Sequence, residues 1–360
     1  MKKYTDTDVL TSARKRVSYL FDNYEKIQIS ISGGKDSTVL WHLCLSEAIK
    51  RNRKINVFFL DQEAEYYNTI EVIKQQMNHD LINPLWYQVP IYMTNATSSS
   101  DYFLYAWGEN ENWIREKNPL SIKSIEEKYP QRFYDFFGYL EKKQENTANL
   151  VGLRAEESLT RFRAVTKKEC INKIKWGTVV SKEKNVYKFY PIYDWTVYDV
   201  WKYINDYSVE YNKIYDMMFR NNYTIYNKMR VSNLIHEMSY KCLIDLPKFE
   251  PETYDKLCKR VSGVATASRY AMEKTFFSNK ELPTHYKSWL EFRNFLTENI
   301  INKYQKVKFL NRFEKQPKSE KTYQKQVGQL LINDYENNRP ITENSEKKKD
   351  FLNKFINEIL

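Results

Sequence analysis

The sequence contains little cysteine and glycine and no long apolar run. Its four cysteines, Cys44, Cys170, Cys242 and Cys258, lie far apart and form no CxxC pair. This argues against a zinc or iron–sulfur site and is typical of proteins in a reducing compartment. No apolar stretch is long enough to span a bilayer, and the first residues, MKKYTDTDVL, lack the apolar core of a signal peptide. We therefore expect a cytoplasmic protein with no membrane partner.

Only eight glycines occur among 360 residues, and two of them are adjacent at Gly33 and Gly34. Alternating apolar and polar residues predict a strand over 27–32, and an amphipathic pattern predicts a helix over 37–51. Two glycines permit a tight turn between these elements and a close backbone approach to a ligand. Because backbone N–H groups and the helix dipole both face such a turn, the pattern predicts an anion-binding site.

The turn reads SGGKDS over 32–37 and resembles the SGGxDS loop of the PP-loop ATP pyrophosphatases, an adenine nucleotide alpha hydrolase-like group. It is not a Walker A loop, because Asp36 follows Lys35 where that motif has Ser or Thr. The resemblance implies that the loop holds the β- and γ-phosphates and leaves the α-phosphorus open to attack. It implies catalytic roles for Lys35 and Asp36, and Mg²⁺ binding by Asp36. The nucleotide-binding residues that it implies in this segment are Ser30, Ser32, Gly33, Gly34, Ser37 and Thr38.

The segments around this loop predict an α/β fold. Expected strands over 27–32, 55–60 and 85–89 alternate with expected helices over 37–51 and 64–78. Strands that alternate with helices through short connections predict a doubly wound, mostly parallel sheet. Ligands of such sheets bind at the carboxyl ends of the strands. The loop and the end of the second strand are therefore expected at the same edge.

An acidic segment, DQEAEYYNT, closes the second expected strand at Asp61. It resembles the D-T-G-x-x-F-P-E-T segment of phosphoadenylyl-sulfate (PAPS) reductases, without the Gly and Pro. The resemblance implies that Leu60 and Asp61 bind the nucleotide and that Asp61 binds a metal. For Glu63 and Glu65 the alternative stays open that acids at a helix N-terminus complement its dipole.

Three further stretches complete the expected organisation of this part of the chain. Residues 5–24 are predicted as a helix that opens at an S/T-x-x-D signal. Residues 92–118 lack a clear period and are predicted as a long loop beside the site. Residues 121–143 are predicted as one helix, because their apolar residues recur at helical spacing.

A second motif, NLVGLRAEESLTR, spans 149–161. Its two arginines, Arg154 and Arg161, could hold phosphate or sulfate oxygens in forked contacts. The motif resembles G-x-R-x-x-E-S-x-x-R of PAPS reductases and their relatives, which implies catalytic roles for both arginines. It also implies nucleotide binding by Gly152, Glu157 and Ser158. The alternative is an ordinary Arg/Glu pair on one helix.

A third segment, residues 190–204, resembles P-L-x-D-W-T-x-x-D-V-W-x-Y-I of the same superfamily. Thr196 and Asp199 are expected to form a capping box. Asp194, which precedes the cap, is a candidate nucleotide-binding residue. Residues 211–215 resemble the N-x-L-Y of these enzymes, so the resemblance extends over about 25–220.

Departures from the reductases argue against their chemistry. No cysteine follows Cys258, whereas PAPS reductases use a thiol in a C-terminal E-C-G-x-H setting, and the cysteine pairs of iron–sulfur reductases are absent. The whole-chain pattern, including 228–237 and 249–254, resembles instead the IbrA-type branch. That branch is often encoded beside a ParB-like partner in mobile or prophage DNA, which implies such a partner here.

We expect three regions: a PP-loop nucleotide-binding domain over 1–220, a helix-rich region over 221–334, and a polar linker with a terminal helix over 335–360. Residues 303–325 carry eight Lys or Arg against two Glu, with aromatics between them, and the chain has a net charge of +11. Such a segment suits a nucleic-acid backbone or an acidic partner. The alternative is the solvated basic face of a helical unit.

The sequence thus predicts a protein that binds ATP, or PAPS or adenylyl sulfate, with Mg²⁺. The first functional hypothesis is an ATP pyrophosphatase that adenylates an acceptor, in sulfur transfer or nucleic-acid modification. The second is a nucleotide-sensing module that acts through a ParB-like partner or DNA. A PAPS reductase is the weakest of the three.

Overall fold

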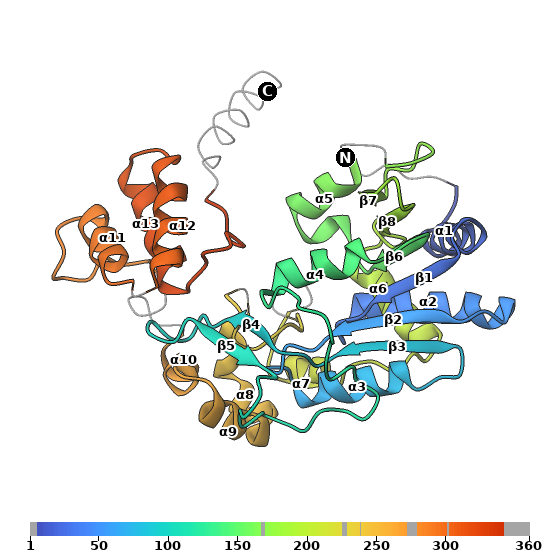
Figure 1. The fold of residues 1–360 in the computed structure, drawn as a ribbon, viewed down its shortest axis with the longest axis horizontal. Helices are drawn as coiled ribbons and strands as arrows, with labels where there is room; N and C mark the ends of the chain where they lie inside the picture. Colours follow the sequence, from blue (N-terminus) through green and yellow to red (C-terminus); the bar gives the residue numbers. More distant parts are fainter. Residues whose placement is uncertain are drawn as a thin grey trace. The chain divides into compact units, whose positions relative to one another are not determined.

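Figure 1 shows the fold, for which we use a computed structural model. The structure describes residues 6–166, 170–224, 229–237, 239–271, 279–300 and 302–341. Three expected features, namely a helix start at Thr5, the motif residue Lys228 and the helix over 350–359, lie outside the described residues.

The chain divides into two compact units that interleave along the sequence. The first comprises Met1–Met93, Tyr105–Leu234 and Pro247–Arg260, and the second comprises Thr94–Leu104, Ile235–Leu246 and Val261–Leu360. Each unit therefore gathers stretches that are far apart in the sequence. The expected domain boundary at residue 220 stays a prediction.

The first unit is built on a six-stranded sheet of order β3-β2-β1-β6-β8-β7. All neighbours in the sheet pair in parallel except β7 and β8, which are antiparallel. The strands are β1 Lys26–Ser30, β2 Ile55–Leu60, β3 Ile82–Tyr87, β6 Thr147–Val151, β7 Gly177–Ser181 and β8 Val186–Phe189. The predicted doubly wound, mostly parallel α/β sheet is confirmed.

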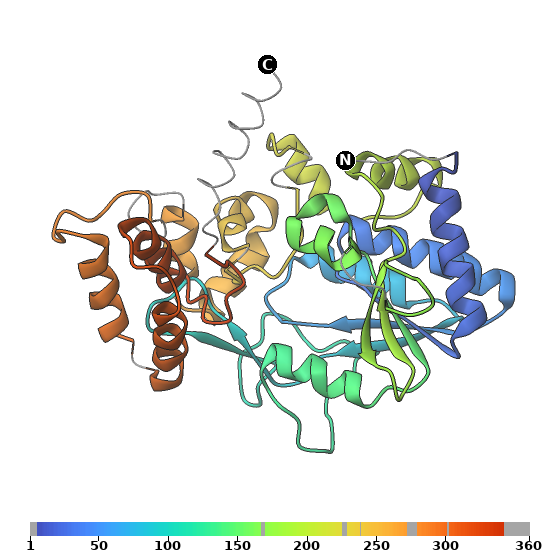
Figure 2. The same cartoon turned by 90° about the horizontal axis from the view of Figure 1, so that it is seen from above.

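Helices cover both faces of this sheet. The helices of this unit are α1 Val9–Asn23, α2 Lys35–Arg51, α3 Tyr67–Met77, α4 Phe133–Lys142, α5 Leu159–Thr166, α6 Val197–Asp206, α7 Ile214–Arg220 and α9 Pro251–Arg260, with a 3-10 turn, η1, at Ala155–Glu157. In Figure 2, α2 (blue) and α4 (green) lie on opposite faces. Successive side chains of a strand point to opposite faces. Accordingly, Phe59 of β2 contacts Trp86, while its neighbour Phe58 contacts Phe137 of α4.

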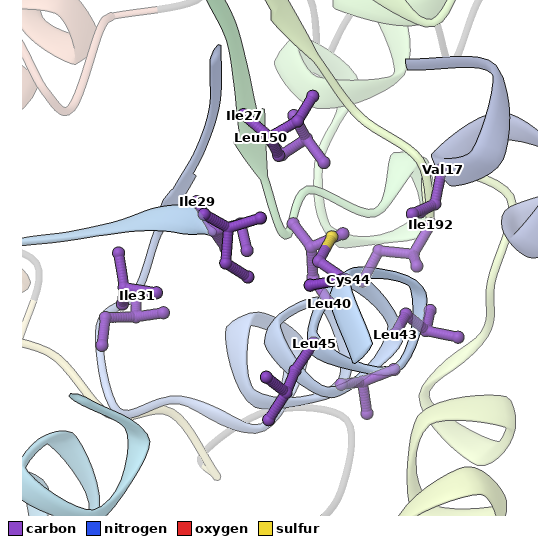
Figure 3. Close-up of a cluster of buried hydrophobic side chains, with 14 of the residues drawn as sticks. Val17, Ile27, Ile29, Ile31, Leu40, Leu43, Cys44, Leu45, Leu150 and Ile192 are labelled. Atoms are coloured by element: carbon purple, nitrogen blue, oxygen red, sulfur yellow. The ribbon is translucent and has the colours of Figure 1, made fainter. Parts of the chain in front are cut away.

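The core of the first unit lies between α2 and the middle of the sheet. Figure 3 shows Leu40 and Cys44 of α2 facing Ile29 of β1 and Leu150 of β6. These side chains are fully buried. Because β1 and β6 are adjacent in the sheet, this packing sets the start of α2 directly beside the end of β6.

The second unit is mainly helical, as predicted for the C-terminal part of the chain. Its elements are η2 Tyr240–Ile244, α10 Val264–Tyr270, α11 Trp289–Glu298, α12 Lys303–Glu314 and α13 Glu320–Leu331. A short helix, α8, spans Leu246–Phe249 at the change between units. The cluster Phe309, Phe313, Leu330 and Tyr335 forms a small separate core. In the part of the chain that the structure describes, no helix is long and apolar enough to cross a membrane.

Two predicted elements are wrong. Residues 92–118 are not one loop, because β4 Ile91–Thr94 and β5 Phe103–Ala106 form a two-stranded sheet. The helix expected over 121–143 begins only at Phe133. The preceding stretch is irregular and forms single bridges at Ile122 and Arg132, and the Ile122 amide donates to Trp86 O at 2.7 Å. Sheet pairing therefore overrides the helical spacing of these apolar residues.

The remaining elements differ from prediction mainly at their ends. The helix expected over 5–24 begins at Val9 with Asp8 as its cap, since Asp8 Oδ1 accepts the Thr11 amide at 2.8 Å. The strand expected over 85–89 is shifted to Ile82–Tyr87 and includes Pro84, which is tolerated because β3 is an edge strand. The capping box of α6 is confirmed, with Thr196 and Asp199 bonding reciprocally.

Gly152 lets the end of β6 approach the start of α2. A Cβ atom at this position would lie 2.9 Å from both the Asp36 carbonyl carbon and the Ser37 amide nitrogen. Backbone atoms of a helix start cannot yield as a flexible side chain can. The glycine is therefore required by the contact between the two motifs.

We predict that Gly152→Ala lowers the free energy of unfolding by roughly 1–3 kcal/mol, because the added methyl overpacks this contact. Gly138→Ala is the matched control: Gly138 lies inside α4, and beyond the backbone of its own helix an added Cβ would meet nothing within 4 Å, so the change should stabilise by up to about 1 kcal/mol. Urea unfolding of both variants measures the difference. Equal stabilities would contradict the proposed packing constraint.

Candidate functional site

The SGGKDS loop joins β1 to α2, and its residues are held by the helix start. α2 begins at Lys35, two residues earlier than predicted, so Lys35 and Asp36 lie in its first turn. Gly33 has φ +65°, a left-handed conformation that favours glycine. The N-cap, Gly34, supplies no side-chain hydrogen bond to the helix. The first N–H groups of α2 are thus not capped by a side chain at that position, which leaves the positive helix end available to an anion.

Two serine hydroxyls border this helix start. Ser37 Oγ donates to Gly34 O at 2.9 Å and accepts the Ser32 amide at 3.2 Å. Ser32 Oγ lies 3.3 Å from Ser37 Oγ, and Ser32 is exposed. The loop therefore satisfies several of its own polar groups.

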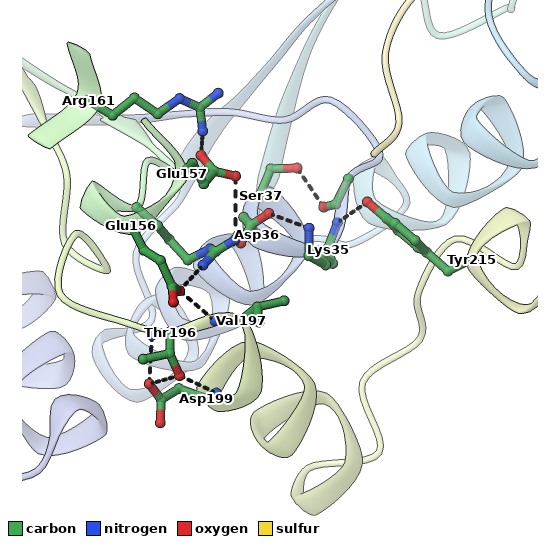
Figure 4. A network of polar contacts seen from close by, with 12 residues as sticks. Lys35, Asp36, Ser37, Glu156, Glu157, Arg161, Thr196, Val197, Asp199 and Tyr215 are labelled. Carbon is green, nitrogen blue, oxygen red and sulfur yellow. Dashed lines mark hydrogen bonds and ion pairs between the residues drawn. The ribbon is translucent and has the colours of Figure 1, made fainter. Parts of the chain in front are cut away.

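Arg154 connects the two predicted motifs. Its Nε donates to Asp36 Oδ1, and Lys35 Nζ donates to Asp36 Oδ2 at 3.1 Å, so both oxygens of Asp36 carry a cationic donor. The other two nitrogens of Arg154 contact Glu156 Oε2 at 2.9 Å and Glu157 Oε1 at 3.5 Å. Figure 4 shows this network. The Arg154 side chain is only 5% exposed, so its guanidinium is buried among three carboxylates.

The network continues to α5 and α6. Arg161 forms an ion pair with Glu157, and its backbone amide donates to Ser158 Oγ at 3.2 Å. Glu156 Oε2 also accepts the Val197 amide at 3.0 Å, which ties the start of α6 to the site. Arg161 is half-buried, and both burial and the charge of Arg230 lower its pKa.

Three residues at the site were not among the predicted site residues. Asn212 Nδ2 donates to Gly33 O at 3.1 Å and to Thr69 Oγ1 at 2.9 Å, which holds the loop against α3. Tyr215 OH accepts the Lys35 amide at 3.1 Å. Arg230 is exposed and acts electrostatically on Arg161 and Tyr215. Asn212 and Tyr215 lie in the segment that resembles N-x-L-Y, and this resemblance could have identified them as site residues. Arg230 lies within the 228–237 segment.

Four other predicted site residues lie in β1, β2, α2 and the segment before α6, and two of them form hydrogen bonds to other helices. Thr38 Oγ1 accepts Gln76 Nε2 at 2.9 Å and is fully buried. The two oxygens of Asp194 accept hydrogen bonds from Arg16 of α1 at 2.8 and 2.6 Å. Ser30 and Leu60 are the last residues of β1 and β2, at the carboxyl edge of the sheet.

Comparison with known proteins identifies the family. The sequence profile of the phosphoadenosine phosphosulfate reductase domain matches residues 26–221, more than half of the chain. The chain belongs to this family. A second profile, for a domain of unknown function termed DUF3440, matches residues 224–356. The family match covers the sheet, the SGGKDS loop and the Arg154 network, and it confirms the predicted PAPS reductase-like superfamily.

Two curated relatives are themselves uncharacterized. The protein YbdN of Escherichia coli K12 is 26% identical over 315 residues, which are 82% of this chain and 76% of that protein. MJ0066 of Methanocaldococcus jannaschii is 28% identical over 217 residues, which are 57% of this chain and 38% of that protein. These two relatives therefore provide no activity that could be compared with this chain.

Solved structures show distant similarity. The PAPS reductase of Candida auris matches with a TM-score of 0.35 and 12% identity, over 60% of this chain and 93% of that chain. The FMN adenylyltransferase of Candida glabrata, in complex with FMN and the ATP analogue AMPCPP, matches with a TM-score of 0.34 and 14% identity, over 60% and 64%. At these scores the similarity bears neither on substrate nor on mechanism.

The carboxylate of Asp61, at the end of β2, is surrounded by hydrogen-bond donors. Asp61 is fully buried, and its carboxylate accepts hydrogen bonds from the Glu63 amide at 2.9 Å, Trp86 Nε1 at 3.0 Å and Gln88 Nε2 at 2.9 Å. It also forms an ion pair with Arg115. A metal role for Asp61 stays a prediction, and it would require the exchange of these four donors.

Asp36 is the predicted Mg²⁺ ligand nearest the start of α2. Among the described residues, no group of three or more His, Cys, Asp or Glu could hold a metal ion. Mg²⁺ at phosphate-transfer sites is usually held by one or two carboxylates together with the substrate phosphates and water. Asp36 is 14% exposed, and both its oxygens accept from cations, so a metal role there stays a prediction and would require Lys35 or Arg154 to move.

Two further acids are buried beside Asp61. Glu63 is fully buried and accepts hydrogen bonds from the Trp107 amide at 2.9 Å and from Arg260 Nε at 2.8 Å. Glu65 is buried as well, and burial, with the charge of Asp61 second, raises its pKa to about 8. These acids are therefore part of the core and not exposed helix-start residues.

We predict that Arg154→Gln lowers the free energy of unfolding by roughly 3–5 kcal/mol, because it removes the buried cation shared by three carboxylates and leaves only Lys35 beside Asp36. Arg163→Gln, at an exposed arginine of α5, should change it by less than about 0.5 kcal/mol. Chemical denaturation of both variants measures the values. A mild effect at Arg154 would show that water or Lys35 compensates for the lost charge.

Glu65 gives a pH-dependent prediction. Its pKa is higher in the folded protein than in the unfolded chain, so folding takes up a proton between about pH 4.5 and 8. The contribution of Glu65 to stability is therefore lost as the pH rises through this window. Glu65→Gln should flatten the decline and stabilise the protein at pH 8 but not at pH 5, as measured by thermal unfolding. If wild type and variant keep parallel pH profiles, Glu65 ionises normally.

Proposed function

We propose that the chain binds ATP, or a related adenine nucleotide such as PAPS or adenylyl sulfate, and cleaves ATP between the α- and β-phosphates. An acceptor is adenylated and pyrophosphate is released. The observation that carries the proposal is the glycine turn at the start of α2, joined through Asp36 to the buried guanidinium of Arg154. Membership of the reductase-domain family supports an adenine nucleotide as the ligand.

In this proposal the loop holds the leaving group. The amides of the α2 start, with Ser32 and Lys35, bind the β- and γ-phosphates. An oxyanion of the acceptor forms a bond to the α-phosphorus, and the bond from that phosphorus to the bridging oxygen breaks. The electron pair leaves with pyrophosphate, whose charge the helix end and Lys35 stabilise.

The two arginines take different roles. Arg154 is buried and contacts three carboxylates, so it acts by positioning Asp36. Arg161 is half-buried and pairs with Glu157 alone among the described carboxylates. Because the neighbouring Arg230 adds a second positive charge, Arg161 is the arginine suited to an anionic acceptor or to the α-phosphate.

Asp36 would hold Mg²⁺ at this site. The ion would neutralise phosphate charge and orient the leaving group. Lys35, which donates to the same carboxylate at 3.1 Å, would shift its hydrogen bond toward the phosphates when the ion binds.

A nucleotide-sensing module with a ParB-like partner is the second candidate function. The observation that favours it is an exposed apolar stripe on α12, formed by Tyr304, Val307 and Leu310. Binding of nucleic acid through 303–325 has less support: Phe309 and Phe313 are buried, and Arg312 donates to backbone oxygens of the same unit. A PAPS reductase remains the weakest proposal and would release sulfite from PAPS with thioredoxin.

The test is product analysis of ATP labelled at the α-phosphorus, with Mg²⁺. We expect the wild type to form labelled AMP or a labelled adenylate together with pyrophosphate. Asp36→Asn should lower the rate by about 100-fold or more, a typical effect of losing one group that stabilises transition-state charge. Asp206→Asn, at an exposed acid of α6, is the matched control and should keep the wild-type rate.

Two results would contradict the enzyme proposal. Pyrophosphate release at the full rate by Asp36→Asn would remove Asp36 from the chemistry. Tight ATP binding by the wild type without product would favour the sensing module instead.

A further inference from the structure

Tyr215 is a buried hydroxyl directed at the start of α2. Its side chain comes from α7, is 2% exposed, and its oxygen accepts the Lys35 amide at 3.1 Å. A Cβ atom on Gly34 would lie 3.5 Å from the same oxygen. The Lys35 ammonium lies 5.6 Å from the centre of the tyrosine ring. Figure 4 shows Tyr215 pointing toward Lys35 from the side opposite to Glu156 and Glu157.

The hydroxyl proton of Tyr215 has no acceptor among the described residues. A tyrosine hydroxyl both accepts and donates, and here only the accepting side is used. Buried donors are rarely left without a partner, since an unmet donor costs free energy. Burial, with the charge of Asp36 second, raises the pKa of Tyr215, so the proton is retained at neutral pH. The group is therefore a permanent donor beside a helix N-terminus.

We propose that Tyr215 is a phosphate-binding residue that selects ligands with a pyrophosphate group. Its hydroxyl keeps the Lys35 amide as donor and gives its own proton to an oxygen of the β- or γ-phosphate. The inference rests on the proposed function, because it takes the phosphates of a nucleotide to occupy the SGGKDS loop. It deepens that function by naming the group that distinguishes a triphosphate from AMP.

The position of the ring supports a direct role. The ring of Tyr215 packs on Trp201 of α6 with ring centres 5.4 Å apart and the planes nearly perpendicular. Asn212, three residues earlier, binds Gly33 O at 3.1 Å. The hydroxyl is thus held at the loop by contacts that do not depend on the hydroxyl itself. Its removal should leave the ring in place.

Tyr211 provides a closely matched control. Its ring also packs on Trp201, with centres 5.3 Å apart, but its hydroxyl donates to Asp216 at 2.7 Å and not to the loop. Tyr211→Phe therefore removes a half-buried hydroxyl from the same aromatic cluster without altering the start of α2.

The experiment is calorimetric titration of wild type, Tyr215→Phe and Tyr211→Phe with three probes: inorganic pyrophosphate, the uncleavable analogue AMPCPP, and AMP. A hydrogen bond to a charged group corresponds to an affinity change of about tenfold or more. We expect Tyr215→Phe to weaken the binding of pyrophosphate and of AMPCPP by that same factor. Its affinity for AMP should stay within about twofold of the wild-type affinity. Tyr211→Phe should match the wild type with every probe.

The outcomes separate the two proposals. The inference would be overturned if the wild type binds pyrophosphate and Tyr215→Phe binds it equally well or more tightly. The tyrosine would then only occupy the site until a phosphate displaces it. Equal weakening of all three probes would overturn it too, by showing a general loss of loop structure, which thermal unfolding of the variant would also reveal. Failure of the wild type to bind AMPCPP and pyrophosphate would refute the proposed function itself.

Discussion

The contact between Arg154 and Asp36 is the interaction on which the site depends. Asp36 lies in the first turn of the helix after β1, and Arg154 follows β6, the neighbouring strand. A guanidinium buried to this degree requires compensating carboxylates, and it has three. The pair therefore fixes the helix start and the arginine motif as one unit. Gly152 makes this possible, because any side chain there would strike the backbone of the helix start.

The start of α2 shows a second constraint, which concerns unmet hydrogen-bonding groups. Gly34 cannot cap the helix with a side chain, so the first amides of α2 need other partners. Ser37 accepts the Ser32 amide of the preceding turn, and Tyr215 accepts the Lys35 amide. Both partners are uncharged hydroxyls, so the N-cap position of α2 carries no negative charge.

The sequence correctly predicted those parts of the fold that depend on local patterns of residues. The α/β sheet followed from apolar strands that alternate with amphipathic helices, and the capping box of α6 from Thr196 and Asp199 alone. The prediction failed over 92–118, where β4 and β5 pair with each other, and over 121–132, where Ile122 and Arg132 pair with Tyr87 and Tyr92. Such pairing depends on a partner outside the segment itself, and local periodicity carries no information about it. Interleaving of the two units is hidden from the sequence for the same reason.

By itself the sequence determined the family, the sheet and the two motifs, because glycines, arginines and acids at fixed spacing have few other uses. Only the tertiary structure decided what each residue contacts. It placed Asp194 on Arg16 and surrounded Asp61 with four donors. It also brought Tyr215 to Lys35 across 180 residues of chain. Contacts of this kind form when helices and strands pack on a shared core. The environment of a residue therefore depends on residues that are distant in the sequence.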